Sequence, residues 1–189
     1  MMDVRVIGVG TLGRRMVVSL AKERKLKAQF VVVDDGDCDC CMTLTLDELK
    51  EAVPEILSAD RVFILGALGG RTGTRAVEIL IEHPAAASPR VEFYLVLPFA
   101  AESLRRRRAE RLVARMKELG ASVHLFDNEH LLRLNGHTTL RRAITIFPMR
   151  IQEAMYNFFR LSKETLEYEG FRLKDLDREI RLLEAVPAR

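Results

Sequence analysis

The chain has 189 residues, of which 48% are hydrophobic and 30% are charged, so it is long enough for one well-buried core and short for two. Its formal net charge of +3 does not call for a nucleic-acid partner. The amino terminus lacks the features of a signal peptide, and no apolar run approaches the roughly 20 residues of a membrane span. We therefore expect a cytoplasmic protein with no membrane span and no nucleic-acid partner.

Three cysteines, Cys38, Cys40 and Cys41, lie within four consecutive positions of the acidic stretch "DDGDCDCC". Such close spacing cannot build a long-range disulfide framework, which favours a reducing compartment. Thiols and carboxylates together are able to hold a metal, but a zinc site usually draws its ligands from two separated pairs. We therefore expect a solvent-facing loop and no metal site here.

Strand and helix patterns alternate five times along the first two thirds of the chain. Short apolar runs predict buried strands at residues 4–10, 28–35, 61–68, 91–98 and 122–128. Amphipathic patterns predict helices at residues 12–25, 45–60, 74–83 and 101–120. This alternation predicts a Rossmann-like α/β fold, a three-layer sandwich with a mostly parallel sheet.

Local signals mark the ends of two of these helices. Thr45 followed by Glu48 is the pattern of a capping box, and Pro54 further on is able to kink or divide that helix. Gly120 is placed to end the fourth helix.

After Leu140 the pattern changes to one long helix over residues 140–169, which Pro148 is able to break or kink and Gly170 ends. A short last helix follows. We expect residues 1–138 to form a nucleotide-binding α/β domain, and residues 139–189 to form the long helix and the terminal helix, packed on the same domain.

Two glycine-rich turns between a strand and a helix are suited to binding phosphate. The first, "GVGTLG", has Gly8, Gly10 and Gly13 in a G-x-G-x-x-G arrangement, and the second, "GGRTGT", runs from Gly69 to Thr74. Glycine lets the backbone approach an anion, and a helix amino end offers free N–H groups. Tight packing of helix on strand is the alternative explanation of the first turn. Two such turns in one sheet predict a bound nucleotide polyphosphate.

An NAD-binding Rossmann site is an alternative. It would use the first turn together with Asp34 or Asp35, which follow the second strand and would bind a ribose. That reading does not explain the second turn.

Several stretches resemble the tubulin/FtsZ family in order along most of the chain. "LGGRTGT" resembles the signature G-G-G-T-G-T-G, and "VIGVGTLG" resembles the first phosphate loop of FtsZ. "LPFAAESLRRRRAE" and "DNEHLL" resemble the segments that contact the ribose and the guanine. The resemblance implies GTP or GDP as the ligand, and Mg²⁺ is compatible with either nucleotide. The nucleotide-binding positions that it implies are Gly8, Gly10, Thr11, Gly13, Gly69, Gly70, Thr72, Gly73, Thr74, Glu102, Arg106 and Asn128.

Arginines depart from the family pattern at the phosphate loops. Arg71 and Arg75 replace glycines of the signature, and Arg14 replaces one in the first loop. Arginine is able to bind phosphate as a fork of donors or to fill the space that a phosphate needs. Ile144 stands where the family has an aromatic residue that stacks on guanine.

Hydrolysis in FtsZ uses acids that reach the nucleotide of the next subunit, and the resemblance places this role on Asp175, with Asp177 nearby. Leu173 and Arg178 replace other polar residues of that segment. We therefore expect weak or absent GTP hydrolysis, and any enzyme activity to be that of a GTPase.

Three functions fit these observations. The first is an FtsZ/tubulin-like guanine-nucleotide-binding protein of the cell-division cytoskeleton, which assembles with itself or regulates an FtsZ-like partner. The second is an interaction module that keeps the FtsZ fold and has lost the nucleotide. The third is the NAD-binding Rossmann protein.

Overall fold

The computed structural model describes the chain except residues 1, 24–25, 37, 135–137, 162–165 and 185–189. It divides into two compact units, residues 1–126 and residues 127–189. Within the described residues, no helix combines the length and the apolar character that crossing a membrane requires.

A six-stranded sheet in the order β3-β2-β1-β4-β5-β6 forms the centre of the first unit. Its strands are β1 Val4–Val9, β2 Gln29–Val33, β3 Met42–Leu44, β4 Arg61–Ala67, β5 Val91–Leu97 and β6 Ser122–Asp127. β1 pairs in parallel with β2 and β4, β2 with β3, and β4 with β5. The α/β class with a mostly parallel sheet is therefore confirmed.

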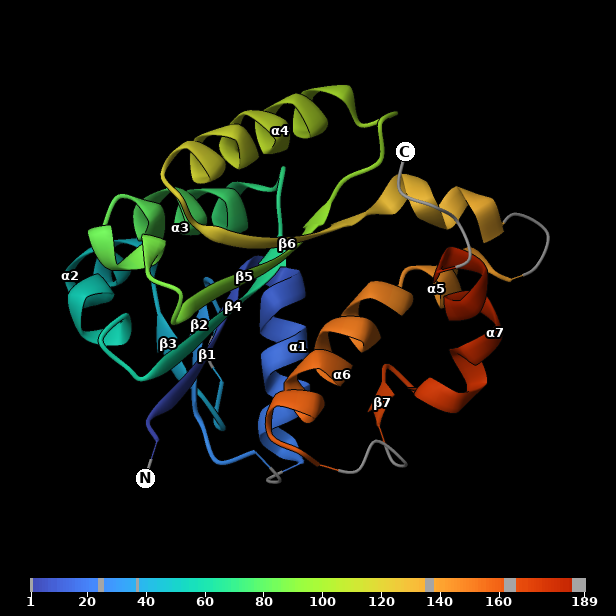
Figure 1. The fold of residues 1–189 in the computed structure, drawn as a ribbon, viewed down its shortest axis with the longest axis horizontal. Helices are drawn as coiled ribbons and strands as arrows, with labels where there is room; N and C mark the ends of the chain where they lie inside the picture. The colour runs from blue at the N-terminus through green and yellow to red at the C-terminus, as the bar shows by residue number, and fades with distance from the viewer. Residues whose placement is uncertain (1, 24–25, 37, 135–137, 162–165, 185–189) are drawn as a thin grey trace. The chain divides into compact units, whose positions relative to one another are not determined.

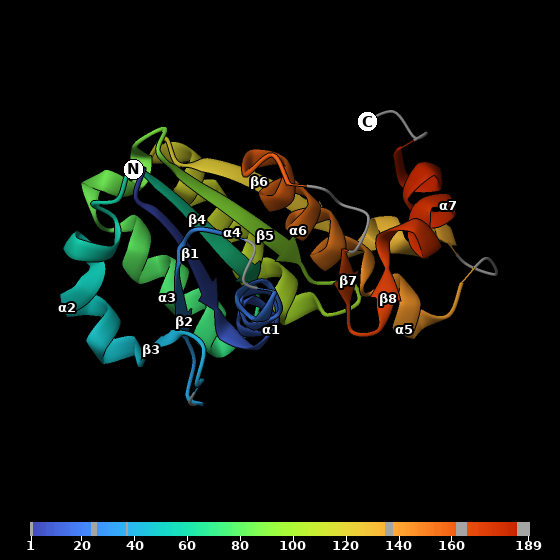
Figure 2. The same ribbon diagram turned by 90° about the horizontal axis from the view of Figure 1, so that it is seen from below.

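Helices cover both faces of this sheet (Figures 1 and 2). They are α1 Gly10–Lys22, α2 Leu46–Ile56, α3 Arg71–Ile81 and α4 Ser103–Glu118, with a short 3₁₀ helix η1 at Pro84–Ala87. Helices α2, α3 and α4 share one apolar core with the sheet, whereas the buried face of α1 does not belong to it. Strands buried on both faces read as continuous apolar runs, which is why the sequence revealed them.

The sequence missed β3, which pairs with β2 through only three residues, Met42 to Leu44. Three residues are too few for strand periodicity to emerge. The strand is defined by its neighbour in the sheet and not by its own sequence.

The predicted helix ends of the first unit are confirmed. The Thr45 hydroxyl accepts from the Glu48 N–H at 3.3 Å, and the Glu48 carboxylate accepts from the Thr45 N–H at 2.7 Å. Pro54 lies inside α2 without ending it. Gly120, with φ of +77°, follows α4, and the next N–H returns to the Met116 carbonyl at 3.0 Å.

The second unit contains helices and one small antiparallel pair of strands. Its elements are η2 Asn128–Leu134, α5 Leu140–Ala143, α6 Ile146–Phe158, β7 Glu167–Tyr168, β8 Phe171–Arg172 and α7 Leu173–Glu184. The prediction of one long helix over residues 140–169 is therefore wrong.

Backbone chemistry explains both breaks in that predicted helix. In a continuous helix the ring of Pro148 would clash with the Ile144 carbonyl, so α6 restarts at Ile146 and places the proline in its first turn. At the other end Arg160 adopts φ of +54°, and the Leu161 N–H bonds the Tyr156 carbonyl at 2.9 Å. A non-glycine residue here left no signal in the sequence.

The prediction that Gly170 ends a helix is wrong. Gly170 lies in the hairpin turn between β7 and β8. Glu169 and Gly170 both have positive φ, at +49° and +81°. Two consecutive positive φ values are typical of the type I′ turn that joins antiparallel strands.

Candidate functional site

The two glycine turns meet at one edge of the sheet. β1 and β4 are parallel neighbours, so their carboxyl ends place Gly10 beside the turn that begins after Ala67. Together they enclose a hollow of about 430 Å³, a size typical of small-molecule sites. Its lining residues are Val9, Gly10, Thr11, Leu12, Arg15, Ala67, Gly70, Arg71, Thr72, Gly73 and Arg105.

The turns touch through their backbones. A Cβ atom at Gly10, where φ is +67°, would lie 2.9 Å from the Gly73 amide nitrogen. A Cβ atom at Gly73 would lie 2.8 Å from the Ala67 carbonyl oxygen. A side chain at Gly10 would push the two turns apart, and one at Gly73 would also lie 3.3 Å from the Val9 oxygen of the first turn, so both glycines allow the turns to approach closely.

Gly8 and Gly13 of the first turn serve packing instead. A Cβ atom at Gly8 would lie 2.4 Å from the Gly13 oxygen, and one at Gly13 would lie 2.2 Å from the Leu65 oxygen. These two glycines let α1 approach the sheet closely and do not line the hollow. The G-x-G-x-x-G pattern thus has two functions, of which only that of Gly10 concerns the hollow.

Helices α1 and α3 begin at the hollow without side-chain caps. Val9 and Gly70 occupy the N-cap positions, neither makes a side-chain cap hydrogen bond, and neither first turn contains an acidic residue. Free N–H groups and the positive end of the helix dipole favour an anion at such a place.

The two predicted threonines of the second turn have different surroundings. Thr72 is partly exposed and lines the hollow. Thr74 is 2% exposed, and its hydroxyl oxygen accepts a hydrogen bond from the Gly69 N–H at 2.9 Å. Thr74 therefore shapes the turn from behind, and Thr72 faces the space that a ligand would occupy.

Of the arginines that replace family glycines, only Arg71 lines this hollow, and Arg14 and Arg75 line the hollows beside it. Arg14 points toward the loop after β2, where its Nη1 lies 4.0 Å from the Asp34 carboxylate and packs over Gly36. Arg75 pairs with Glu78 at 3.0 Å. Arg71 lines the hollow, is exposed, and makes no ion pair with any residue that the structure describes.

Arg105 lines the hollow, although the resemblance had pointed to Arg106. Arg105 pairs with the Glu102 carboxylate, which also accepts from the Phe99 N–H at 3.3 Å. Arg106 donates to the Pro98 carbonyl at 2.9 Å and to Glu110 at 2.7 Å. Spacing alone could not choose between neighbouring arginines of one run. Glu102 thus positions Arg105, while Arg106 anchors the start of α4.

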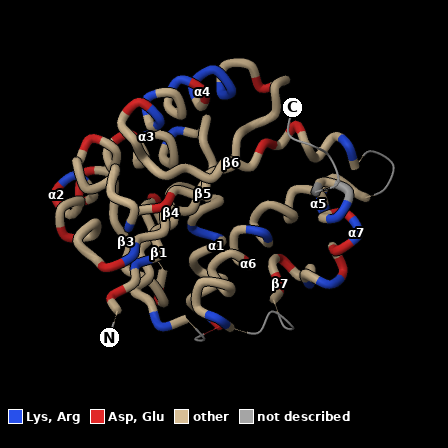
Figure 3. The backbone as a smooth tube through the Cα atoms, in the orientation of Figure 1, with Lys and Arg blue, Asp and Glu red and all other residues tan. Residues whose placement is uncertain are grey.

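Two further hollows adjoin the first and share residues with it. One, of about 370 Å³, includes Asp35, Arg75, Glu78 and Arg108 and shares Gly70, Arg71 and Thr72. The other, of about 440 Å³, shares Thr11 and Arg15. Arginine and lysine outnumber acids around the three hollows, and Figure 3 shows further basic positions along α4. The electrostatic character of this edge suits an anionic ligand.

Three predicted site residues belong to the second unit. Asn128 is the first residue of η2, while Asp175 and Asp177 are exposed on α7. Ile144, at the position of the family's stacking aromatic, is 47% exposed between α5 and α6. Their roles toward a nucleotide stay predictions.

The cysteines of the β2–β3 loop lie close together beside the third hollow. Burial raises the pKa of Cys38, but hydrogen bonds with Cys40 and Cys41 outweigh it and leave that pKa below its usual value. Burial raises the pKa of Cys40 and of Cys41. Cys38 is therefore the most readily ionised of the three thiols.

No family model matches the chain. Cell division protein FtsZ 1 of Archaeoglobus fulgidus is 34% identical over 101 residues, which cover 53% of this chain and 27% of that protein. Cell division protein FtsZ 2 of Methanocaldococcus jannaschii is 29% identical over 101 residues, with the same coverage. The sequence match thus spans well under half of these relatives.

Solved structures extend the likeness to nearly the whole chain. An empty FtsZ dimer of M. jannaschii superposes with a TM-score of 0.67 at 18% identity, covering 96% of this chain and 60% of that one. CetZ from Methanosaeta thermophila gives a TM-score of 0.60 at 19% identity, covering 98% and 60%. The structural match shows the shared fold, and the sequence match shows descent. The chain is a divergent homologue of the GTPase domain of the FtsZ/tubulin family.

Proposed function

We propose that this protein binds GTP or GDP in the hollow between the two glycine turns. The observation that carries the proposal is the convergence of two uncapped helix amino ends on one space bordered by Arg15, Arg71 and Arg105. Backbone amides of Gly10, Thr11 and the second turn would bind the phosphates, and the guanidinium groups would neutralise their charge. The homology to FtsZ supports guanine as the base, with Asn128 as its reader.

Magnesium would be held mainly by the nucleotide. Among the described residues that line the hollow there is no carboxylate, and the side-chain oxygens are the hydroxyls of Thr11 and Thr72. Mg²⁺ usually keeps several waters and binds through substrate phosphates. We expect it to accompany GTP without a dedicated protein cage.

We propose binding with little turnover. The acids available for attack on a neighbouring subunit's nucleotide are Asp175 and Asp177, while Leu173 and Arg178 stand where the family has other polar groups. Phosphate release faster than about 1 per minute, still far below typical enzyme turnover, would contradict this proposal.

We propose that the protein associates with itself or binds an FtsZ-like partner. The cellular location that we propose is a cytoplasmic cytoskeleton of cell division. Solved structures with the same fold are described as an FtsZ dimer and as GDP-form protofilaments of TubZ from Bacillus thuringiensis serovar israelensis. Nucleotide-dependent sedimentation of the purified chain, alone and with an FtsZ-like protein, tests this part.

Calorimetric titration of nucleotide-stripped protein with GTP, GDP, ATP and NAD tests the binding proposal. We expect GTP and GDP to bind and ATP and NAD to bind at least about tenfold more weakly. Thr72→Val should weaken GTP binding and leave the fold intact, because its hydroxyl lines the hollow and carries no internal hydrogen bond among the described residues. NAD binding in preference to GTP would overturn the proposal.

An interaction module that has lost the nucleotide is the second candidate. It is favoured by the basic side chains Arg71 and Arg75, which stand where the family signature has glycines. If the folded wild-type chain binds no nucleotide at millimolar concentration, and Thr72→Val also folds, this reading replaces the first.

A further inference from the structure

Three thiols converge in the loop between β2 and β3. The Sγ atoms of Cys38 and Cys40 are 3.2 Å apart, and those of Cys40 and Cys41 are 3.6 Å apart. All three sulfur atoms lie within 4.8 Å of one another. The tetrahedral or trigonal thiolate sphere of a single metal ion, with metal–sulfur bonds near 2.3 Å, brings its sulfurs to about this separation.

The short connection between the two strands favours this convergence of cysteines that are already close in sequence. Parallel neighbouring strands usually need a crossover of roughly a dozen residues or more, but residues 34–41 alone join β2 to β3. The loop is also held near its start, where Arg14 lies 4.0 Å from Asp34 and packs over Gly36. A short connection that is fixed at both ends must turn tightly, and the cysteines occupy the turn.

The surroundings of the thiols suit an ion and its exchange with solvent. Cys38 and Cys40 line a hollow of about 440 Å³ that also contains Asp39, Arg14 and Lys22. A water molecule from this hollow is able to supply a fourth ligand. The two cations offset the negative charge that three thiolates would bring.

A disulfide explains this arrangement less well. The structure has three free thiols, and a disulfide between two of them would not explain why the third lies so close. Hard cations such as Mg²⁺ and Ca²⁺ prefer oxygen ligands, whereas thiolates select Zn²⁺ and Cu⁺. The spacing differs from the paired cysteines of a structural zinc finger, which is why the sequence predicted no metal.

We propose that Cys38, Cys40 and Cys41 form a binding site for one thiophilic d¹⁰ metal ion, Zn²⁺ or Cu⁺. The site lies at the carboxyl edge of the sheet. The hollow that Cys38 and Cys40 line shares Thr11 and Arg15 with the hollow of the glycine turns. Metal binding here does not depend on a nucleotide.

The test uses the full chain, reduced and stripped of metal under anaerobic conditions. Competition with a chromophoric chelator measures Zn²⁺ affinity in one arm and Cu⁺ affinity in the other, and Co²⁺ reports sulfur ligation through its thiolate charge-transfer band. We expect one equivalent of Zn²⁺ or Cu⁺ per chain. Failure of the chain to take up either ion, or a Co²⁺ complex without that band, would overturn the proposal.

Variants separate the thiols from the rest of the loop. Each of Cys38→Ser, Cys40→Ser and Cys41→Ser should weaken binding at least about tenfold, and the triple variant should abolish it. Met42→Leu removes an exposed neighbouring sulfur that is not a proposed ligand and should change nothing. Circular dichroism verifies the fold of each variant, and the single variants serve if the triple one does not fold. Equal losses in Met42→Leu, or unchanged binding in the cysteine variants, would refute the site.

Discussion

Helix α2 begins in a different way from helices α1 and α3. Thr45 and Glu48 satisfy the first N–H groups of α2 from within the helix, and Asp47 and Glu48 add negative charge to its first turn. Helices α1 and α3 have neither a side-chain cap nor an acid in the first turn. A helix that is closed by its own residues contributes stability, whereas one left open is able to bind an anion. The difference separates the scaffold from the candidate site.

The first test of this comparison concerns the close approach of α1 to the sheet. Gly13→Ala should lower the free energy of unfolding by about 3 kcal/mol or more, because the new Cβ would lie 2.2 Å from the Leu65 oxygen. Chemical denaturation measures the loss. Gly70→Ala is the matched control: its Cβ would meet only Arg105 at 4.0 Å, so the loss should stay below about 1 kcal/mol. Equal losses would show that packing does not distinguish these glycines.

The second turn depends on Thr74 for its shape. Thr74→Val should cost about 2 kcal/mol, because the Gly69 N–H would lose its acceptor in a buried place. Thr72→Val should lower the free energy of unfolding by less than about 0.5 kcal/mol. Thermal unfolding of both variants measures these losses. A reversed order would mean that the hydroxyl facing the hollow, and not the one behind the turn, holds the loop.

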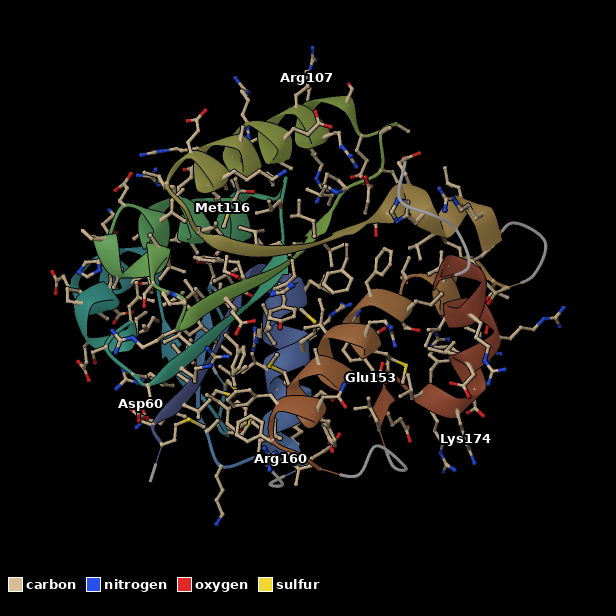
Figure 4. The ribbon with its side chains drawn as sticks, viewed as in Figure 1. Asp60, Arg107, Met116, Glu153, Arg160 and Lys174 are labelled. Carbon is tan, nitrogen blue, oxygen red and sulfur yellow. The ribbon has the colours of Figure 1, made fainter. Side chains whose placement is uncertain are left out.

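The basic border of the hollow should affect binding more than folding. Arg105→Ala should weaken GTP binding about tenfold, equivalent to about 1.4 kcal/mol, through the loss of a charge-assisted contact with phosphate. Arg107 projects from α4 away from the sheet (Figure 4), so Arg107→Ala should leave the affinity unchanged. Calorimetry at two salt concentrations measures both. Equal effects of the two variants would indicate general attraction by charge and no defined contact.

The cap of α2 should produce the smallest effect. Thr45→Ala should lower stability by about 1 kcal/mol at neutral pH. Hydrogen bonds from the Thr45 N–H and hydroxyl lower the pKa of Glu48 below 4.5, its ordinary value. The contribution of Glu48 is therefore present above pH 4.5 and lost as the pH falls through the lowered pKa. Denaturation at pH 7 and below pH 4 should show the gap between wild type and Thr45→Ala narrowing, and a constant gap would contradict this assignment.

The sequence by itself determined the features that depend on neighbouring residues. Alternating apolar runs indicated the α/β class because strands buried on both faces need continuous apolar sequence. The capping box at Thr45 and the glycine end of α4 were readable because their partners lie within a few residues. The two glycine turns were visible for the same reason.

Only the tertiary structure decided how these parts divide their tasks. It placed Arg105 at the hollow and bonded Arg106 to Pro98 and Glu110, a choice that depends on where α4 lies against the β4–α3 turn. It ended α6 at a left-handed Arg160, which no glycine announced. It turned the backbone of the short β2–β3 connection so that the sulfurs of three cysteines close in sequence lie within 4.8 Å of one another. Each outcome depends on contacts between segments that are distant in sequence or on backbone geometry that residue types do not encode.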